Sequence, residues 1–163
     1  MLNLIDIKNK KWISAISYTL FIVYIIIAVI LLFLSPYRQA AYELNSGGSN
    51  PYNIIPFKTI TDYIKASSHI NQNIWMSNLF GNVLAFFPLG VFLPWLFKRY
   101  IGFWRTTSTV FLATLSVEIL QFATRVGSFD IDDIILNTIG GAIGYLLIKI
   151  TYLLLLKERT HED

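Results

Sequence analysis

The chain has 163 residues, of which 55% are hydrophobic and only 14% are charged, and its net charge is +3. Soluble domains carry about a quarter charged residues, so this composition favours a membrane protein. The chain contains no cysteine, which excludes disulfides, thiol catalysis and cysteine-ligated zinc. Its basic residues lie at the ends of apolar runs and do not form a patch interleaved with aromatics, so we expect no nucleic-acid partner.

Four apolar segments are long enough to cross a membrane as helices, since a bilayer core of about 30 Å needs about 20 helical residues. The first, 12–34, has 23 residues without a charge and is not followed by a cleavage site, which predicts a retained anchor. The others are 79–97, 106–123 and 134–156. The sequence therefore predicts an all-α integral membrane protein with four transmembrane helices, forming a single domain over 1–163.

The 44 residues from 35 to 78 form a long loop between the first two predicted spans. Within it, "NIIPFKTI" begins a short amphipathic piece with Phe57, Ile60 and Ile64 on one helical face. This piece is too short to span, so we expect it to lie in the membrane interface.

The distribution of lysine and arginine predicts the orientation of the spans, because cytoplasmic loops carry an excess of these residues. Eight of them lie on one side: Lys8, Lys10, Lys11, Lys98, Arg99, Arg105, Lys157 and Arg159. The other side has Arg38, Lys58 and Lys65, spread over the long loop, and Arg125. Both termini are therefore predicted to be cytoplasmic, with the long loop facing outward.

Polar residues gather where the third and fourth spans meet, in "SVEILQFATRVGSFDIDDIILNTIGG" (116–141). Residues spaced by three or four share a helical face. By this rule the third span carries a polar face of Glu118, Gln121 and Arg125. The start of the fourth span carries another, made of Asp130, Asp133 and Asn137, and the start of the second carries Asn82. Helical rise places them at similar depth, which predicts a polar cluster open to the outer face.

This cluster has a functional and a structural interpretation. Ionisable groups inside a membrane are costly and often mark functional sites. Alternatively, Arg125 pairs with Glu118 or Asp133 to hold the helices in register, and the asparagines form interhelical hydrogen bonds worth about 1 kcal/mol each. For the glycines 140, 141 and 144 we expect close helix contact.

Four stretches resemble the VanZ-like family in order and spacing: "NIIPF" (53–57), "GNVLAFFPLG" (81–90), "EILQ" (118–121) and "RVGSFDIDDIILNTIGG" (125–141). The resemblance covers about 53–148, and its pattern residues here are Asn53, Pro56, Phe57, Gly81, Asn82, Pro88, Gly90, Glu118, Gln121, Arg125, Asp130, Asp132, Asp133, Asn137 and Gly140. It implies a small multi-pass protein of the bacterial cytoplasmic membrane. The family is named for an accessory protein of glycopeptide-resistance clusters linked to teicoplanin, and the resemblance supplies no mechanism.

The leading functional hypothesis is a non-enzymatic protein whose outward polar pocket binds a membrane lipid, a lipid-linked envelope precursor or an amphiphilic glycopeptide, without a cofactor. Its candidate residues are Asn53, Asn82, Glu118, Gln121, Arg125, Asp130, Asp132, Asp133 and Asn137.

Two alternatives stay open. In a metal-dependent enzyme acting on a phosphate-bearing lipid, the aspartates 130, 132 and 133 would hold a divalent cation and Glu118 would act as acid or base. However, Asp132 points away from Asp133 on a helix, and neither histidine has a ligand partner for zinc. The protein could also be a subunit of a larger transporter.

Overall fold

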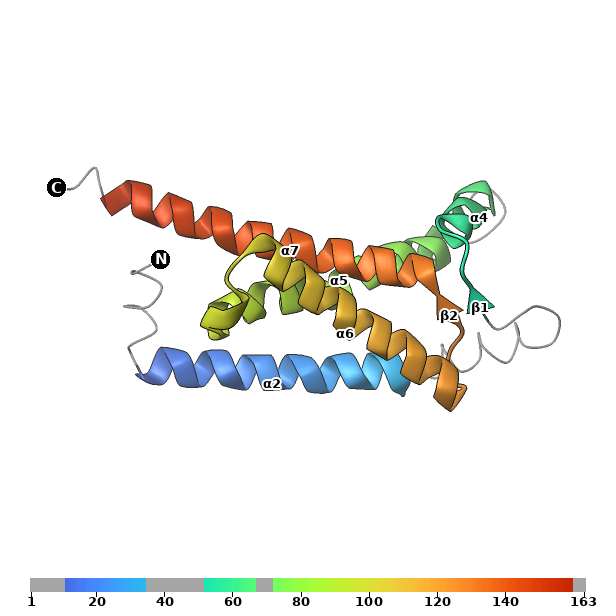
Figure 1. Ribbon diagram of the computed structural model, residues 1–163, viewed down its shortest axis with the longest axis horizontal. Coiled ribbons are helices and arrows are strands. Elements are labelled where there is room, and N and C mark those ends of the chain that lie inside the picture. Colours follow the sequence, from blue (N-terminus) through green and yellow to red (C-terminus); the bar gives the residue numbers. More distant parts are fainter. Residues whose placement is uncertain (1–10, 35–51, 67–71, 160–163) are drawn as a thin grey trace.

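The computed structural model describes residues 11–34, 52–66 and 72–159. Its long helices are α2 (Lys11–Phe33), α5 (Gln72–Leu96), α6 (Phe103–Thr124) and α7 (Ile131–Arg159) (Figure 1). The shorter elements are the strands β1 (Tyr52–Asn53) and β2 (Phe129–Asp130), the helix α4 (Lys58–Ala66) and the 3-10 helix η1 (Lys98–Tyr100). Each long helix contains a stretch that is long and apolar enough to cross a membrane, which confirms the four predicted spans.

The helix boundaries differ from the predicted ones mainly at the start of α5, which begins at Gln72 and extends beyond the apolar run. Pro88 and Pro94 lie inside α5 without ending it, as expected for a helix whose neighbours satisfy the freed carbonyls. Lys8, Lys10, Arg38 and half of the predicted outward loop (35–51 and 67–71) lie outside the described residues. The orientation of the spans remains a prediction.

One feature of the fold is not helical: β1 and β2 pair in parallel, with Tyr52 opposite Phe129 and Asn53 opposite Asp130. Strands of two residues show no alternating pattern, so the all-α prediction missed them. The pairing places the segment 52–66 against the start of α7. In Figure 1, α4 and both strands lie at one end of the bundle, which we call the α4 end, and η1 lies at the opposite end, the η1 end.

Helices α5 and α7 contact each other backbone to backbone. A Cβ atom added to Gly140 would overlap the carbonyl of Val83 in α5, and Gly144 lies equally close to α5. A Cβ atom on Gly141 would meet the side chain of Val110 in α6 at 2.6 Å. Small residues at membrane helix interfaces permit this approach, and the predicted close helix contact is confirmed.

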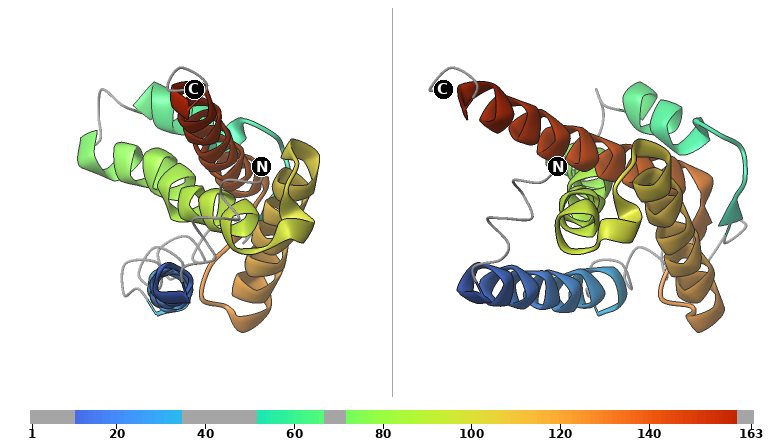
Figure 2. Two further views of the ribbon diagram at one scale, coloured as in Figure 1. Left: turned by 90° about the vertical axis from the view of Figure 1, so that its left-hand side faces the viewer. Right: turned by 60° about the vertical axis from the view of Figure 1, so that its left-hand side comes forward.

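Helix α2 lies beside the other three long helices (Figure 2). Most of its apolar side chains are exposed in the single chain. Hydrogen bonds that join it to the bundle include Tyr24 Oη to Ala85 O at 2.8 Å, Trp95 Nε1 to Ser17 Oγ at 3.1 Å and Gln121 Nε2 to Leu32 O at 2.7 Å. Leu32 belongs to the last turn of α2, where backbone carbonyls have no partner within the helix. Hydrogen bonds of polar side chains and ring contacts such as that of Phe21 with Phe92 therefore hold α2, whereas glycines bring α5 and α7 together.

Candidate functional site

The candidate residues of α6 lie on one buried face. Thr114, Glu118 and Gln121 follow each other at helical spacing, and each is at most 1% exposed. The residues from other helices are also enclosed, with Asn137 at 2% and Asn82 at 7% exposure. The centre of the predicted cluster is therefore buried, whereas Asn53, Asp130 and Asp133 are partly exposed and Arg125 is exposed. The opening of the cluster to the outer face stays a prediction.

Asparagines of two helices hold the cluster together. Asn82 of α5 donates through Nδ2 to Asp133 of α7 at 2.5 Å. Asn137 of α7 donates through Nδ2 to the Thr114 hydroxyl of α6 at 2.7 Å. These bonds confirm the interpretation of the asparagines as interhelical hydrogen-bond donors. Within the described part of the chain, Asn137 Oδ1 and Gln121 Oε1 are buried and accept no hydrogen bond.

Arg125 does not take part in the predicted ion pair. Helix α6 ends at Thr124, and Arg125 adopts a left-handed conformation (φ 59°) as its C-cap, so its exposed side chain leaves the face that carries Glu118. Among residues 11–34, 52–66 and 72–159, Lys58 and Asp62 form the only ion pair. The hypothesis that Arg125 forms a buried pair with Glu118 or Asp133 is therefore wrong in this structure. Helix α6 ends at Thr124, so Arg125 does not continue the helical face on which Glu118 lies.

Glu118 instead binds the backbone of the neighbouring strand. Its Oε2 accepts a hydrogen bond from the amide of Asp130 at 3.0 Å. Because Asp130 lies in β2, this bond attaches the strand to the buried face of α6. A carboxylate inside the bundle thus fixes where the segment between α6 and α7 runs.

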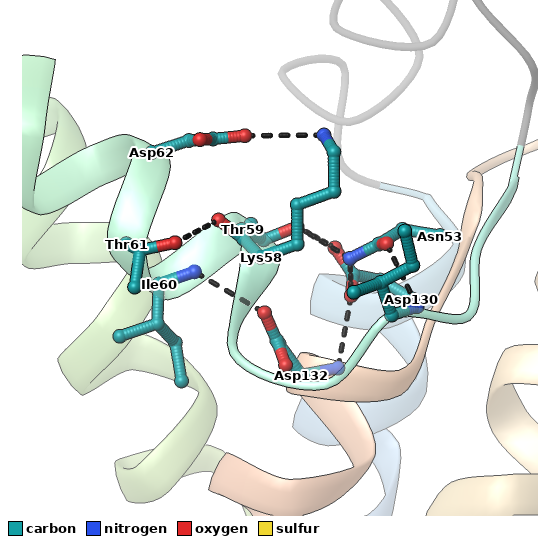
Figure 3. A network of polar contacts seen from close by, with 9 residues as sticks. Asn53, Lys58, Thr59, Ile60, Thr61, Asp62, Asp130 and Asp132 are labelled. Atoms are coloured by element: carbon teal, nitrogen blue, oxygen red, sulfur yellow. Dashed lines mark hydrogen bonds and ion pairs between the residues drawn. The ribbon is translucent and has the colours of Figure 1, made fainter.

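Asp132 caps α4, a helix whose first turn lies more than seventy residues earlier in the chain. Its Oδ1 accepts the amide of Phe57 at 2.5 Å. Its Oδ2 accepts the amide of Ile60 at 3.2 Å, as Figure 3 shows. The first amides of a helix have no partner within it, and a negative charge there is favourable. Asp132 is fully buried, so this cap is an internal contact between α7 and α4.

Asp130 adds a second attachment for the same segment. Its Oδ2 accepts the Thr59 hydroxyl at 2.6 Å, and its Oδ1 accepts Asn53 Nδ2 at 3.1 Å and the amide of Asp132 at 2.9 Å (Figure 3). Burial raises the pKa of Asp130, the three hydrogen bonds lower it by less, and the charge of Asp132 raises it further. We call Asn53, Thr59, Asp130 and Asp132 the tether.

The aspartates do not form a metal centre in this arrangement. Asp130 and Asp132 accept hydrogen bonds from the segment 52–66, whereas Asp133 accepts one from α5. The described residues contain no group of three His, Cys, Asp or Glu side chains that could hold a metal ion. This geometry does not support the metal-dependent enzyme.

The residues between β1 and α4, 54–57, form an exposed apolar loop next to the tether. The sequence patterns did not identify this loop. Ile54, Ile55 and Phe57 are 63%, 60% and 58% exposed, and all three precede the first residue of α4. Phe57 has a φ of 64°, a left-handed conformation that a bulky residue rarely adopts. Helical periodicity placed Phe57 on α4, and nothing in the sequence signals its backbone conformation.

Comparison with known proteins agrees with the fold and with the motifs. The VanZ/LLP1 family pattern matches residues 21–154, a longer range than the motifs alone indicated. Protein VanZ of Enterococcus faecium is 42% identical over 66 residues, which are 40% of this chain and 40% of that protein. The matched part thus spans about two fifths of this curated relative, and no solved structure matches the chain. Since the family pattern covers most of the chain, the protein belongs to the VanZ/LLP1 family.

Proposed function

We propose that this protein is a non-enzymatic component of the bacterial cytoplasmic membrane that binds an amphiphilic envelope molecule at its α4 end, and that it thereby contributes to tolerance of teicoplanin-type glycopeptides. Membership of the VanZ/LLP1 family and the similarity to Protein VanZ support the link to glycopeptides. The predicted orientation makes the α4 end the outer face, which supports the α4 end as the place where an envelope molecule binds.

The conformation of Phe57 is the observation that carries this proposal. Holding a bulky residue in a sparsely populated backbone region costs about 1–3 kcal/mol, and such strain persists mainly where the surroundings impose it. Here the carboxylate of Asp132 accepts the amide of Phe57, while the residue as a whole remains 58% exposed. The ring therefore gains little from burial, and a binding role explains why an aromatic residue occupies this position.

The chemistry of the α4 end suits an amphiphile. Ile54, Ile55 and Phe57 offer apolar contact for an acyl or prenyl chain. Arg125, at the end of α6 next to β2, is exposed and forms no ion pair within the described residues, so its guanidinium is available to a phosphate or carboxylate. A lipid-linked envelope precursor and an acylated glycopeptide both combine these two features.

In this proposal the buried cluster has a positioning role. Glu118 fixes β2, and Asp130 and Asp132 hold the segment 52–66 against it. The ligand then binds the surface that these carboxylates support, and does not enter the cluster itself. Such support would make loss of Asp132 functionally costly, although its side chain is buried and does not meet the ligand.

The test is Phe57→Gly in a susceptible Gram-positive host, because glycine removes the ring and accepts the left-handed conformation without strain. We expect normal membrane abundance and a loss of protection against an acylated glycopeptide. Phe80→Ala is the matched control, since it removes an exposed ring from α5 without changing the loop. Full protection by Phe57→Gly at normal abundance contradicts the proposal, as does equal protection by the wild type against a glycopeptide that lacks the acyl chain.

A further inference from the structure

A basic hollow lies at the η1 end, far from the tether. It has a volume of about 500 Å³ and is lined by Arg99, Tyr100, Arg105 and Thr109. Binding sites for small ligands typically measure about 300–1,000 Å³, so the hollow is large enough for a headgroup. Neither arginine forms an ion pair with any residue in the part of the chain that the structure describes.

The turn that carries these arginines is well braced. The Thr106 hydroxyl donates to the carbonyl of Tyr100 at 2.6 Å, and Thr106 itself is fully buried. The ring of Tyr100 packs edge-on against Phe97, with ring centroids 6.1 Å apart. A fixed backbone keeps the two guanidinium groups near one hollow, which lowers the entropy lost when both bind a single ligand.

The ends of the predicted spans place the hollow at the depth of lipid headgroups. Helix α5 ends at Leu96 and α6 begins at Phe103, so the turn between them marks the boundary of two membrane-crossing helices. Trp104, in the first turn of α6, is 77% exposed, and tryptophan is enriched at the membrane–water interface. The positive end of the α6 dipole faces the same turn.

We propose that this hollow binds the phosphate of an anionic phospholipid headgroup, with Arg99 and Arg105 as its cationic ligands and Tyr100 and Thr109 completing its wall. Arginine matches phosphate because its planar fork donates two parallel hydrogen bonds. A basic pocket beside transmembrane helices on the predicted cytoplasmic side is a suitable site for such a headgroup. This proposal does not depend on what the α4 end binds.

The experiment measures the melting temperature of the purified full chain in a neutral detergent during titration with phosphatidylglycerol, phosphatidylcholine or inorganic phosphate. A ligand that binds only the folded state raises the melting temperature with a dependence that reports its affinity. We expect phosphatidylglycerol to stabilise the wild type and the other two to have little effect. The double variant Arg99→Gln with Arg105→Gln should bind phosphatidylglycerol at least about tenfold more weakly.

The matched control is Lys98→Gln with Lys149→Gln, which removes the same charge from exposed residues that do not line the hollow. Its affinity should fall by less than about threefold, as expected for the loss of long-range attraction alone. Equal losses in the two double variants would overturn the site, because general surface charge would then explain binding. Equal stabilisation by phosphatidylcholine would overturn the need for an anionic lipid.

Inorganic phosphate distinguishes a headgroup from a soluble ligand. If it stabilises the wild type as strongly as phosphatidylglycerol and competes with it, the lipid assignment fails and a soluble phosphate compound becomes the ligand. If the glutamine variant does not fold, Arg99→Lys with Arg105→Lys replaces it. That variant keeps both charges and loses the bidentate geometry, so an intermediate affinity supports the proposal and an unchanged affinity contradicts it.

Discussion

Two regions of the molecule are held together by different physical rules. One is the contact between α5 and α7, and the other is the attachment of α2 and of the segment 52–66 to these helices. Gly140 and Gly144 bring two helix backbones into direct contact. By contrast, the segment 52–66 is attached by the β1–β2 pairing and by side-chain hydrogen bonds such as that of Asp132. Helix α2 is attached by side-chain hydrogen bonds such as that of Gln121 and by ring contacts such as that of Phe21 with Phe92. In lipid, apolar surface gains nothing from leaving water, so helices associate through close packing or through polar bonds. This protein uses direct backbone contact at its centre, whereas its attached parts depend on side-chain hydrogen bonds, to which α2 adds ring packing.

The largest expected effect is at the glycine contact. Gly140→Leu should prevent α5 and α7 from packing, because the added side chain meets the backbone of Val83, which cannot rotate away. We expect the free energy of unfolding to fall by at least about 3 kcal/mol, which is the upper end of the cost of overpacking. The measurement is the melting temperature in detergent together with the yield of folded protein.

Gly81→Ala is the control for this prediction. A Cβ atom at Gly81 meets nothing within 4 Å, so alanine should be neutral or stabilise α5 by up to about 1 kcal/mol through helix propensity. Similar losses in both variants would mean that the glycines matter for the helix itself and not for the contact.

The second effect concerns the tether. Asp132→Ala leaves the amides of Phe57 and Ile60 without their acceptor and should destabilise the attachment of α4 by about 1–3 kcal/mol. Hydrogen exchange at amides 57–62 should accelerate, while the amides of α5 and α7 change little.

Asp62→Asn tests whether any loss of charge in α4 has this effect. It breaks the exposed Lys58–Asp62 pair, and such pairs contribute at most about 1 kcal/mol. If exchange accelerates as much as in Asp132→Ala, charge and not capping holds the segment.

A smaller effect is expected where α2 meets α6. Gln121→Leu removes the donor to the Leu32 carbonyl, and membrane hydrogen bonds of this kind contribute about 1 kcal/mol. Disulfide cross-linking between cysteines introduced into α2 and α6 should become slower. Ser116→Ala, which removes only a bond to Leu112 within α6, should leave the cross-linking rate unchanged, and a decrease there would contradict the assignment.

The smallest effect is a pH dependence. The pKa of Asp130 is raised in the folded state, so the protonated carboxyl favours folding. This contribution to the free energy of unfolding is fully present below the ordinary carboxyl pKa of about 4. It is lost as the pH rises through the pKa that Asp130 has in the folded protein. Asp130→Asn should flatten the decrease of the melting temperature between about pH 4 and neutrality. If Asp130→Asn leaves the pH profile unchanged, other groups cause the decrease of the melting temperature.

The sequence by itself determined the features that depend on neighbouring residues. Each span follows from a local sum of hydropathy, and the helical spacing of Glu118 and Gln121 placed them on one face. The motifs around residues 53–57, 81–90 and 125–141 were specific enough to indicate the family. Glycine contacts at 140 and 144 followed from the general need for close packing in membranes.

Only the tertiary structure decided how these parts meet. The bonds of Asp132 to Phe57 and Ile60 join residues more than seventy positions apart, and no local pattern encodes such a contact. The direction of Arg125 depended on the residue at which α6 ends, because one left-handed residue turns its side chain off the helix face. The burial of Glu118 and Asn137 depended on which faces of α5, α6 and α7 pack together. Contacts between distant segments decide the first and the third, and the local backbone at the end of α6 decides the second, whereas spacing along one helix specifies only which residues share a face.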